Sequence, residues 1–242
     1  MSSEKRRIRN DVIMIGSIVA LIVLGVRLFS DRRYTLVSMM IAFLACFFFY
    51  LTYEKKEGSI RRMVMIAVMT TITVISRLIF GVVPGFKPMS AIIILTGIFM
   101  GPECGFLVGS LAALTSNIFF GQGPWTPFQM LTWGIIGFLS GLPGLRKVLR
   151  NRIPLIIWGM LMGMLYSGIM DIWTVLDLTG VWSWKRYLMA LSTAVPYIIA
   201  YMSSNVVFLM IGLKPLGEKL NRVQTKHGIF NTVAFLIEVM LY

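Results

Sequence analysis

Eight long apolar runs, separated by short polar or basic stretches, dominate the sequence. They cover residues 12–29, 36–53, 63–83, 89–100, 106–120, 128–142, 154–170 and 188–213. A helix needs about 20 apolar residues to cross the hydrocarbon core of a bilayer. The runs between residues 89 and 142 are short and interrupted by glycine, so we expect them to pack inside a bundle, where irregular backbone finds protein partners. The pattern predicts an all-α, polytopic bundle of membrane helices.

Composition and charge agree with a protein that is surrounded by lipid. Of the 242 residues, 57% are hydrophobic and 14% are charged, whereas about 25% of the residues in an ordinary soluble domain are charged. The net charge of +13 comes from short basic clusters between the apolar runs, so we expect no nucleic acid partner. If all eight runs cross, most basic residues lie on one side, which predicts a cell-membrane protein with both termini in the cytoplasm.

A charged, glycine-containing linker at residues 54–62 divides the chain into unequal parts. We expect an N-terminal transmembrane hairpin of two helices with its basic linker at residues 1–58. A core of six spans follows at residues 59–213. Residues 214–242 then form a cytoplasmic basic tail with a short apolar helix.

Signatures of common catalytic and metal sites are missing from the sequence. There is no GxxxxGK[ST] run for binding ATP and no HExxH, and the single histidine, His227, lies in the basic tail. Cys46 and Cys104 lie in or beside apolar segments without a CxxC pair, as is typical of buried free thiols. We therefore expect no enzyme activity, no cofactor and no metal.

Glycines recur at a spacing of four residues in several of the predicted spans. Residues four apart share one face of a helix, and small residues there let two helix backbones approach closely in lipid. We expect these glycines to pack the bundle: Gly97, Gly101, Gly105, Gly109, Gly137, Gly141, Gly159 and Gly163.

Ala67 and Thr71 form a similar small face near the cytoplasmic end of the first span of the core. This face either packs within the bundle or docks another membrane protein.

Three turns at the outward ends of the spans carry the candidate ligand-binding residues. In the first, residues 84–90, two prolines and a glycine fix the backbone, and Lys87 is the one charge. Lysine at the end of a span commonly extends to the lipid headgroups. The alternative is that Lys87 projects over the mouth of the bundle and meets an acidic or carbonyl group of a ligand.

The second turn, within residues 117–133, combines rigid backbone with amides and aromatic rings. Gln129 and Trp133 are four residues apart and share a helix face. An aromatic residue at the membrane interface explains Trp125 alone. It does not explain Asn117, Gln122 and Gln129, because amides within lipid are costly unless they point into the bundle. We expect all five residues to line a ligand site.

The third turn is predicted at residues 171–187 and is rich in tryptophan. Asp171, Trp173 and Asp177 are its candidate binding residues. It forms either an aromatic belt at the membrane interface or a lid that stacks on a flat ligand.

Several of these segments resemble one known family. The segment Phe86-Lys-Pro-Met-Ser90, the glycines from Gly97 to Gly109 and the run Gly121-Gln-Gly-Pro-Trp-Thr-Pro-Phe-Gln129, followed by Trp133, resemble substrate-binding S components of energy-coupling factor (ECF) vitamin transporters. The resemblance covers roughly residues 59–213.

The resemblance implies a function as well as a fold. It implies capture of a vitamin at the outward loops, and delivery to a transmembrane coupling subunit with two cytoplasmic ATPase subunits. Ala67 and Thr71 match the family's Ala-xxx-Ala docking pattern as Ala-xxx-Thr. A cobalamin-type substrate is our first expectation, with riboflavin and other flat vitamins open. The alternative function is a stand-alone secondary transporter or channel for a small organic solute.

Overall fold

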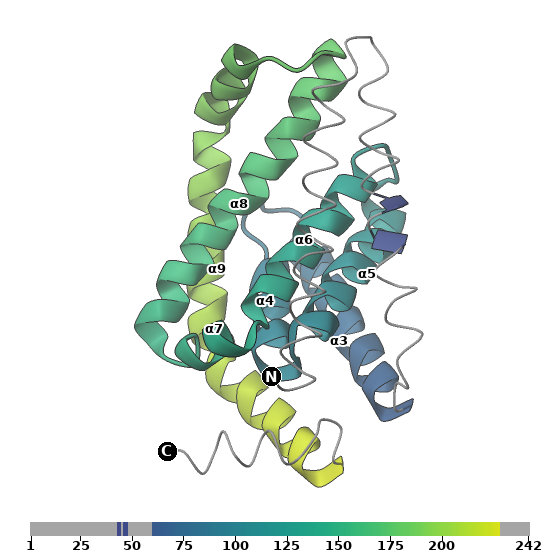
Figure 1. The fold of residues 1–242 in the computed structure, drawn as a ribbon, viewed down its shortest axis with the longest axis vertical. Coiled ribbons are helices and arrows are strands. Elements are labelled where there is room, and N and C mark those ends of the chain that lie inside the picture. Colours follow the sequence, from purple (N-terminus) through teal and green to yellow (C-terminus); the bar gives the residue numbers. More distant parts are fainter. Residues whose placement is uncertain (1–42, 45, 48–59, 228–242) are drawn as a thin grey trace, which may run out of the picture.

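The computed structural model describes residues 43–44, 46–47 and 60–227, and the described part is helical. Most of the predicted N-terminal hairpin and the predicted apolar helix at the C-terminal end lie outside these residues. From residue 60 onward the helices are α3 (Ile60–Ile79), α4 (Met89–Met100), α5 (Pro102–Phe120), α6 (Thr126–Ser140), α7 (Pro143–Val148), α8 (Arg152–Thr179) and α9 (Trp184–His227). Figure 1 shows α8 and α9 side by side, extending beyond the shorter helices.

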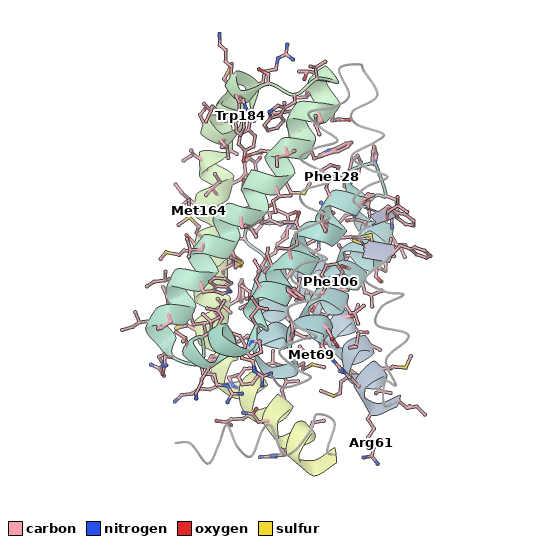
Figure 2. The ribbon with its side chains drawn as sticks, viewed as in Figure 1. Arg61, Met69, Phe106, Phe128, Met164 and Trp184 are labelled. Atoms are coloured by element: carbon pink, nitrogen blue, oxygen red, sulfur yellow. The ribbon has the colours of Figure 1, made fainter. Side chains whose placement is uncertain are left out.

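Four of the described helices, α3, α5, α8 and α9, are long and apolar enough to cross a membrane. Helix α4 is apolar but shorter. The predicted bundle of membrane helices is therefore confirmed in its coarse form, while the count of six core spans and the preceding hairpin stay predictions. Exposed apolar side chains such as Met164 and Leu188 fit contact with lipid, because water would disfavour so much bare apolar surface. Figure 2 shows Met69, Phe106 and Phe128 inside the bundle and Met164 at its periphery.

Helix α4 lies at the centre of the bundle. Its residues are apolar on all sides and nearly all buried, as expected for a helix surrounded by protein. It contacts α3, α5, α6 and α9. This burial explains how a 12-residue helix can exist without spanning the bilayer alone.

The predicted glycine packing is confirmed most clearly between α5 and α6. A Cβ added to Gly105 would collide with the backbone carbonyl of Gly137, and a Cβ on Gly137 would collide with the backbone of Gly105. Gly97 of α4 meets the same Gly137 carbonyl. Gly163 similarly brings α8 against the backbone of α9 at Met202. Only glycine allows these backbones to touch.

The connection between α8 and α9 is shorter than the sequence predicted. The predicted loop at residues 171–187 is wrong, because α8 continues to Thr179 and only four residues separate it from α9. Val175 and Leu176 are buried, so the helical face with apolar packing continues past Asp171. Gly180, with φ of 66°, ends the helix in the left-handed conformation. Helix α9 likewise continues through Pro215 to His227, past the boundary predicted at residue 213.

Candidate functional site

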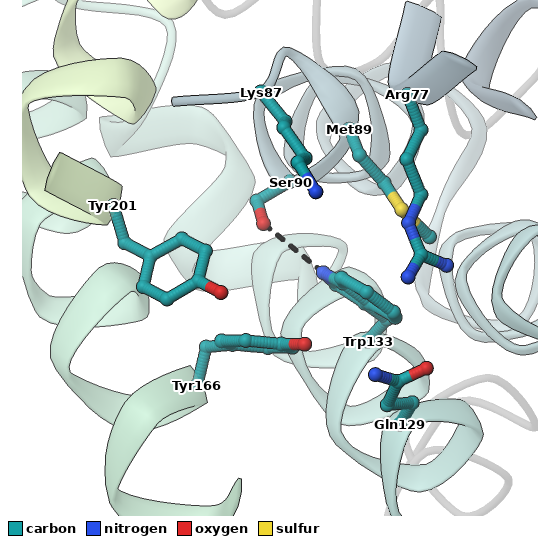
Figure 3. Close-up of a pocket in the computed structure, with 8 residues that line it drawn as sticks. All are labelled: Arg77, Lys87, Met89, Ser90, Gln129, Trp133, Tyr166 and Tyr201. Atoms are coloured by element: carbon teal, nitrogen blue, oxygen red, sulfur yellow. Dashed lines mark hydrogen bonds between the residues drawn. The ribbon is translucent and has the colours of Figure 1, made fainter. Parts of the chain in front are cut away.

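A cavity of about 210 Å³ lies among α3, α4, α6, α8 and α9. Its lining comes from the five helices and from the turn between α3 and α4. Figure 3 shows the lining side chains turned toward a common space: Arg77, Lys87, Met89, Ser90, Gln129, Trp133, Tyr166 and Tyr201.

The α3–α4 turn is fixed against α9, and this places Lys87 at the cavity. Gly85 has φ of 72° and lies so close to Ala200 that a Cβ there would clash with it. The Ser204 hydroxyl donates a hydrogen bond to the backbone carbonyl of Lys87, with an Oγ–O distance of 2.8 Å. The predicted rigidity of this turn therefore has a structural basis in its packing on α9.

A buried polar network holds the guanidinium of Arg77. Its Nη1 donates to Ser116 Oγ and to Asn117 Oδ1, the latter at 3.0 Å. Asn117 Nδ2 in turn donates to Gln129 Oε1 at 2.8 Å and to Thr126 Oγ1 at 3.0 Å. The network links α3, α5 and α6, and it satisfies the amide oxygen and nitrogen that burial of Asn117 would otherwise leave unpaired.

Three aromatic rings form one wall of the cavity. Trp133 and Tyr166 stack with their ring centroids 4.7 Å apart and their planes 30° apart. Tyr201 meets Tyr166 edge to face at 4.9 Å. The Trp133 Nε1–H donates to Ser90 Oγ at 3.1 Å, which orients the indole. Such a wall offers a flat face on which a planar ligand can stack.

Among the residues that the structure describes, the cavity lining carries positive charge and no carboxylate. Arg77 lies 4.7 Å from the centroid of the Phe120 ring and 5.0 Å from that of Trp133. Lys87 Nζ lies 5.1 Å from the same Phe120 ring. Burial lowers the pKa of Lys87, and the positive charge of Arg77 lowers it further.

Of the nine residues predicted to bind substrate, the structure brings three to the cavity lining: Lys87, Gln129 and Trp133. Asn117 is buried behind them and is hydrogen-bonded to Arg77 and Gln129, which do line the cavity. Gln122 is exposed and helps hold the turn, since its Nε2 donates to the Leu114 carbonyl.

The other predicted residues are not in the cavity lining. Trp125 is exposed on the α5–α6 turn. Trp173 is buried in a separate cluster against Phe128, with ring centroids 5.4 Å apart. Asp171 is buried in α8, its Oδ2 without a hydrogen-bond partner, and Asp177 is exposed one and a half turns later. A binding role for these residues stays a prediction.

Arg77, Tyr166 and Tyr201 line the cavity, although they were not among the residues predicted to bind substrate. One signal for Arg77 was available in the sequence: it lies inside an apolar run. A charged residue within a membrane helix is costly and is commonly functional. Met89 and Ser90 carried no such signal, being ordinary residues at the start of α4.

The predicted docking pair lies on the outer surface of α3. Ala67 and Thr71 are both exposed, beside the exposed apolar Val64 and Val68. The Thr71 hydroxyl donates to the Ala67 carbonyl at 2.9 Å. The hydroxyl is thus satisfied within the helix, and the surface stays small and largely apolar.

The fold and the cavity together define the class of protein. It is a helical membrane protein with an aromatic, positively charged cavity between its helices. The model of the family described as ECF-type riboflavin transporter, S component, matches residues 57–222, which is more than half of the chain. The chain belongs to this family. It is accordingly a transporter subunit and not an enzyme, and the resemblance seen in the sequence is confirmed.

The family match does not support the expectation of a cobalamin-type substrate, because the description of the family names riboflavin. Comparisons with curated proteins and with solved structures gave no significant match.

Proposed function

We propose that this chain is the substrate-capture subunit of an ATP-driven ECF importer and that it binds a flat vitamin in the cavity between α3, α4, α6, α8 and α9. The observation that carries the proposal is the cavity itself, in which the rings of Trp133, Tyr166 and Tyr201 lie beside the cations Arg77 and Lys87. Ring stacking gives affinity for a planar ligand, and the cations recognise its carbonyl or acidic oxygens.

Riboflavin-type ligands fit this cavity better than cobalamin does. A corrinoid with its nucleotide loop is several times larger than an isoalloxazine ring, whereas the cavity holds about 210 Å³. The family description points in the same direction. Riboflavin is therefore the first probe to use.

The ATPase activity of the importer would lie on other chains. This sequence has no phosphate-binding glycine loop, so ATP hydrolysis must come from partners, namely a transmembrane coupling subunit and two cytoplasmic ATPase subunits. In this arrangement both termini face the cytoplasm, as the positions of the basic residues predict, and Ala67 with Thr71 contacts the coupling subunit.

A stand-alone secondary carrier is the competing function, and one observation favours it. Asp171 is a buried acid in α8 whose Oδ2 has no hydrogen-bond partner, and acids within membrane helices commonly carry protons or ions in carriers. The described part of the cavity lining contains no acid, which favours the capture subunit.

Binding and transport by the purified full-length chain test the two functions. Riboflavin fluorescence should be quenched by stacking when the chain is added. Trp133→Ala should weaken this binding at least about tenfold, as expected for a buried aromatic contact. The matched control is Trp184→Ala, since Trp184 is 65% exposed at the start of α9, and its binding should equal that of the unaltered protein.

Transport separates a capture subunit from a carrier. Liposomes that contain this chain alone should bind the vitamin but not accumulate it, with or without a proton gradient. Accumulation driven by the gradient, and lost in Asp171→Asn, would establish the carrier and reject the capture subunit.

A further inference from the structure

Arg77 and Lys87 share the cavity, and none of the described residues that line it is acidic. Both lie near one ring, that of Phe120, with Arg77 Cζ at 4.7 Å and Lys87 Nζ at 5.1 Å from its centroid. Like charges brought together away from bulk water repel each other. Contact with the ring face offsets part of this cost, but the ring carries no net negative charge.

The hydrogen bonds of Arg77 use only one part of its guanidinium. Nη1 donates to the neutral oxygens of Ser116 and Asn117, while Nε is buried and has no hydrogen-bond partner. The whole residue is 6% exposed. A buried donor without a partner is costly, and the edge formed by Nε and Nη2 has the fork geometry that pairs with both oxygens of a carboxylate.

A structural role explains only half of this arrangement. Linking α3 to α5 accounts for the bonds of Nη1 to Ser116 and Asn117. It does not account for the free Nε, and it gives no reason for a second cation at the same ring. Lys87 forms no ion pair among the described residues, although its backbone is held in place by Ser204.

We infer that the substrate carries a negatively charged group, of the carboxylate type, that sits between Arg77 and Lys87 while its ring stacks on Trp133 and Tyr166. This rests on the proposed capture function for its site, and it departs from riboflavin, which is neutral, by requiring an acidic group on the flat vitamin. The anion neutralises the buried guanidinium of Arg77 and the half-buried ammonium of Lys87 at once, and it supplies the missing partner for Nε.

Matched pairs of ligands that differ only in charge test the inference. The flavin pair is 10-carboxymethylflavin and its carboxamide, which share the ring and nearly the same shape. Biotin with biotinamide, and nicotinate with nicotinamide, repeat the comparison on other rings. Binding to the purified full-length chain is measured by flavin fluorescence and, for the other pairs, by the intrinsic tryptophan fluorescence. The acid should bind at least about tenfold more tightly than its amide in one or more pairs, as expected for a charge-assisted bidentate contact.

Variants locate the anion. Lys87→Gln should remove most of the preference for the acid over its amide, and Arg77→Gln should do the same. Arg77→Lys should keep part of the preference, because the charge remains without the fork. The control is Lys185→Gln, which removes one positive charge from an exposed position at the start of α9 and should leave the preference intact. If Arg77→Gln does not fold, Lys87→Gln still decides, because the Lys87 side chain forms no hydrogen bond with the described residues that the substitution would remove.

The outcomes for the two proposals are distinguishable. Tight binding of riboflavin, with equal affinity for acid and amide in every pair, would overturn the anionic substrate and leave the capture function standing. A preference for acid over amide on a ring other than flavin would support the anionic substrate and reject the flavin-type vitamin. Binding of neither riboflavin nor any compound of the pairs would overturn both.

Discussion

Arg77 connects the cavity to the surrounding bundle through a chain of neutral amides and hydroxyls. Its guanidinium bonds to Asn117, and Asn117 bonds to Gln129, which lines the cavity. Replacement of any one of these groups leaves a buried polar atom without a partner, so the site behaves as a network rather than as separate residues.

At the scale of single residues, Lys87 predicts how binding depends on pH. Its pKa lies below the ordinary 10.5 because of burial and the charge of Arg77. The ammonium form exists below that pKa, so binding of 10-carboxymethylflavin should be full at lower pH and weaken as pH rises through the lowered value. In Lys87→Arg the charge persists to about pH 12 or above, and the weakening should move to higher pH.

A binding titration from about pH 6 to about pH 10, a range centred below the ordinary lysine value, measures this shift. Tyr166 and Tyr201 are the other titratable groups of the cavity beside Arg77. Equal loss of binding in the unaltered protein and in Lys87→Arg would assign the titration to a tyrosine and contradict the role of Lys87.

At the scale of the elements, the backbone contact between α5 and α6 holds two walls of the site in register. The backbone carbonyl of each of Gly105 and Gly137 lies against the Cα position of the other. One turn away, Gly109 packs against the carbonyl of Trp133. The position of the Trp133 ring in the cavity therefore depends on how closely these two helices approach. No side chain at these positions could be accommodated by a rotamer change, because the neighbouring atoms belong to the backbone.

Gly137→Ala should destabilise the protein by about 2 kcal/mol, because the added methyl group overpacks a backbone contact. The matched control is Gly144→Ala in α7, where an added Cβ meets nothing within 4 Å. That change should leave stability unchanged or raise it slightly, since alanine favours the helix over glycine. Thermal unfolding of both variants in the same detergent measures the difference, and equal midpoints would show that the helices separate at little cost.

At the scale of the whole molecule, α3 has two distinct faces. One is the exposed outer face, and the other contributes Arg77 to the cavity. Ala67 and Thr71 are exposed, whereas Arg77 of the same helix points into the bundle and is buried. A partner bound to the outer face of α3 would thus lie on the same rigid element that holds a cavity residue. If the coupling subunit docks there as proposed, α3 is the element that it shares with the cavity.

Ala67→Phe should leave vitamin binding unchanged and reduce ATP-driven uptake at least about tenfold, because a bulky ring prevents close helix packing. The matched control is Leu161→Phe, an exposed apolar position on α8, which should support normal uptake. Uptake is measured in cells that express the coupling module with each variant. Normal uptake by Ala67→Phe would place the docking surface elsewhere.

Part of the site was predictable because some of its residues are conspicuous along the chain. Lys87 is the one charge in a proline-rich turn, and Gln129 and Trp133 follow a rigid turn at helical spacing. The interpretation of residues 171–187 as a loop was wrong, because tryptophan and aspartate at a span end fit a helix as well as a turn. Residues 171–179 belong to α8 because Val175 and Leu176 pack inside the bundle, and composition does not reveal this packing.

The sequence by itself determined that the chain is a membrane-embedded helical bundle, because apolar length and charge distribution decide which solvent a segment can occupy. It also determined the close packing at Gly105 and Gly137, since only glycine permits backbone contact. The tertiary structure alone decided that Arg77, Tyr166 and Tyr201 share one cavity with Lys87 and Trp133. These residues come from helices far apart in the chain, and their meeting depends on how the helices pack, which no local pattern of residues records.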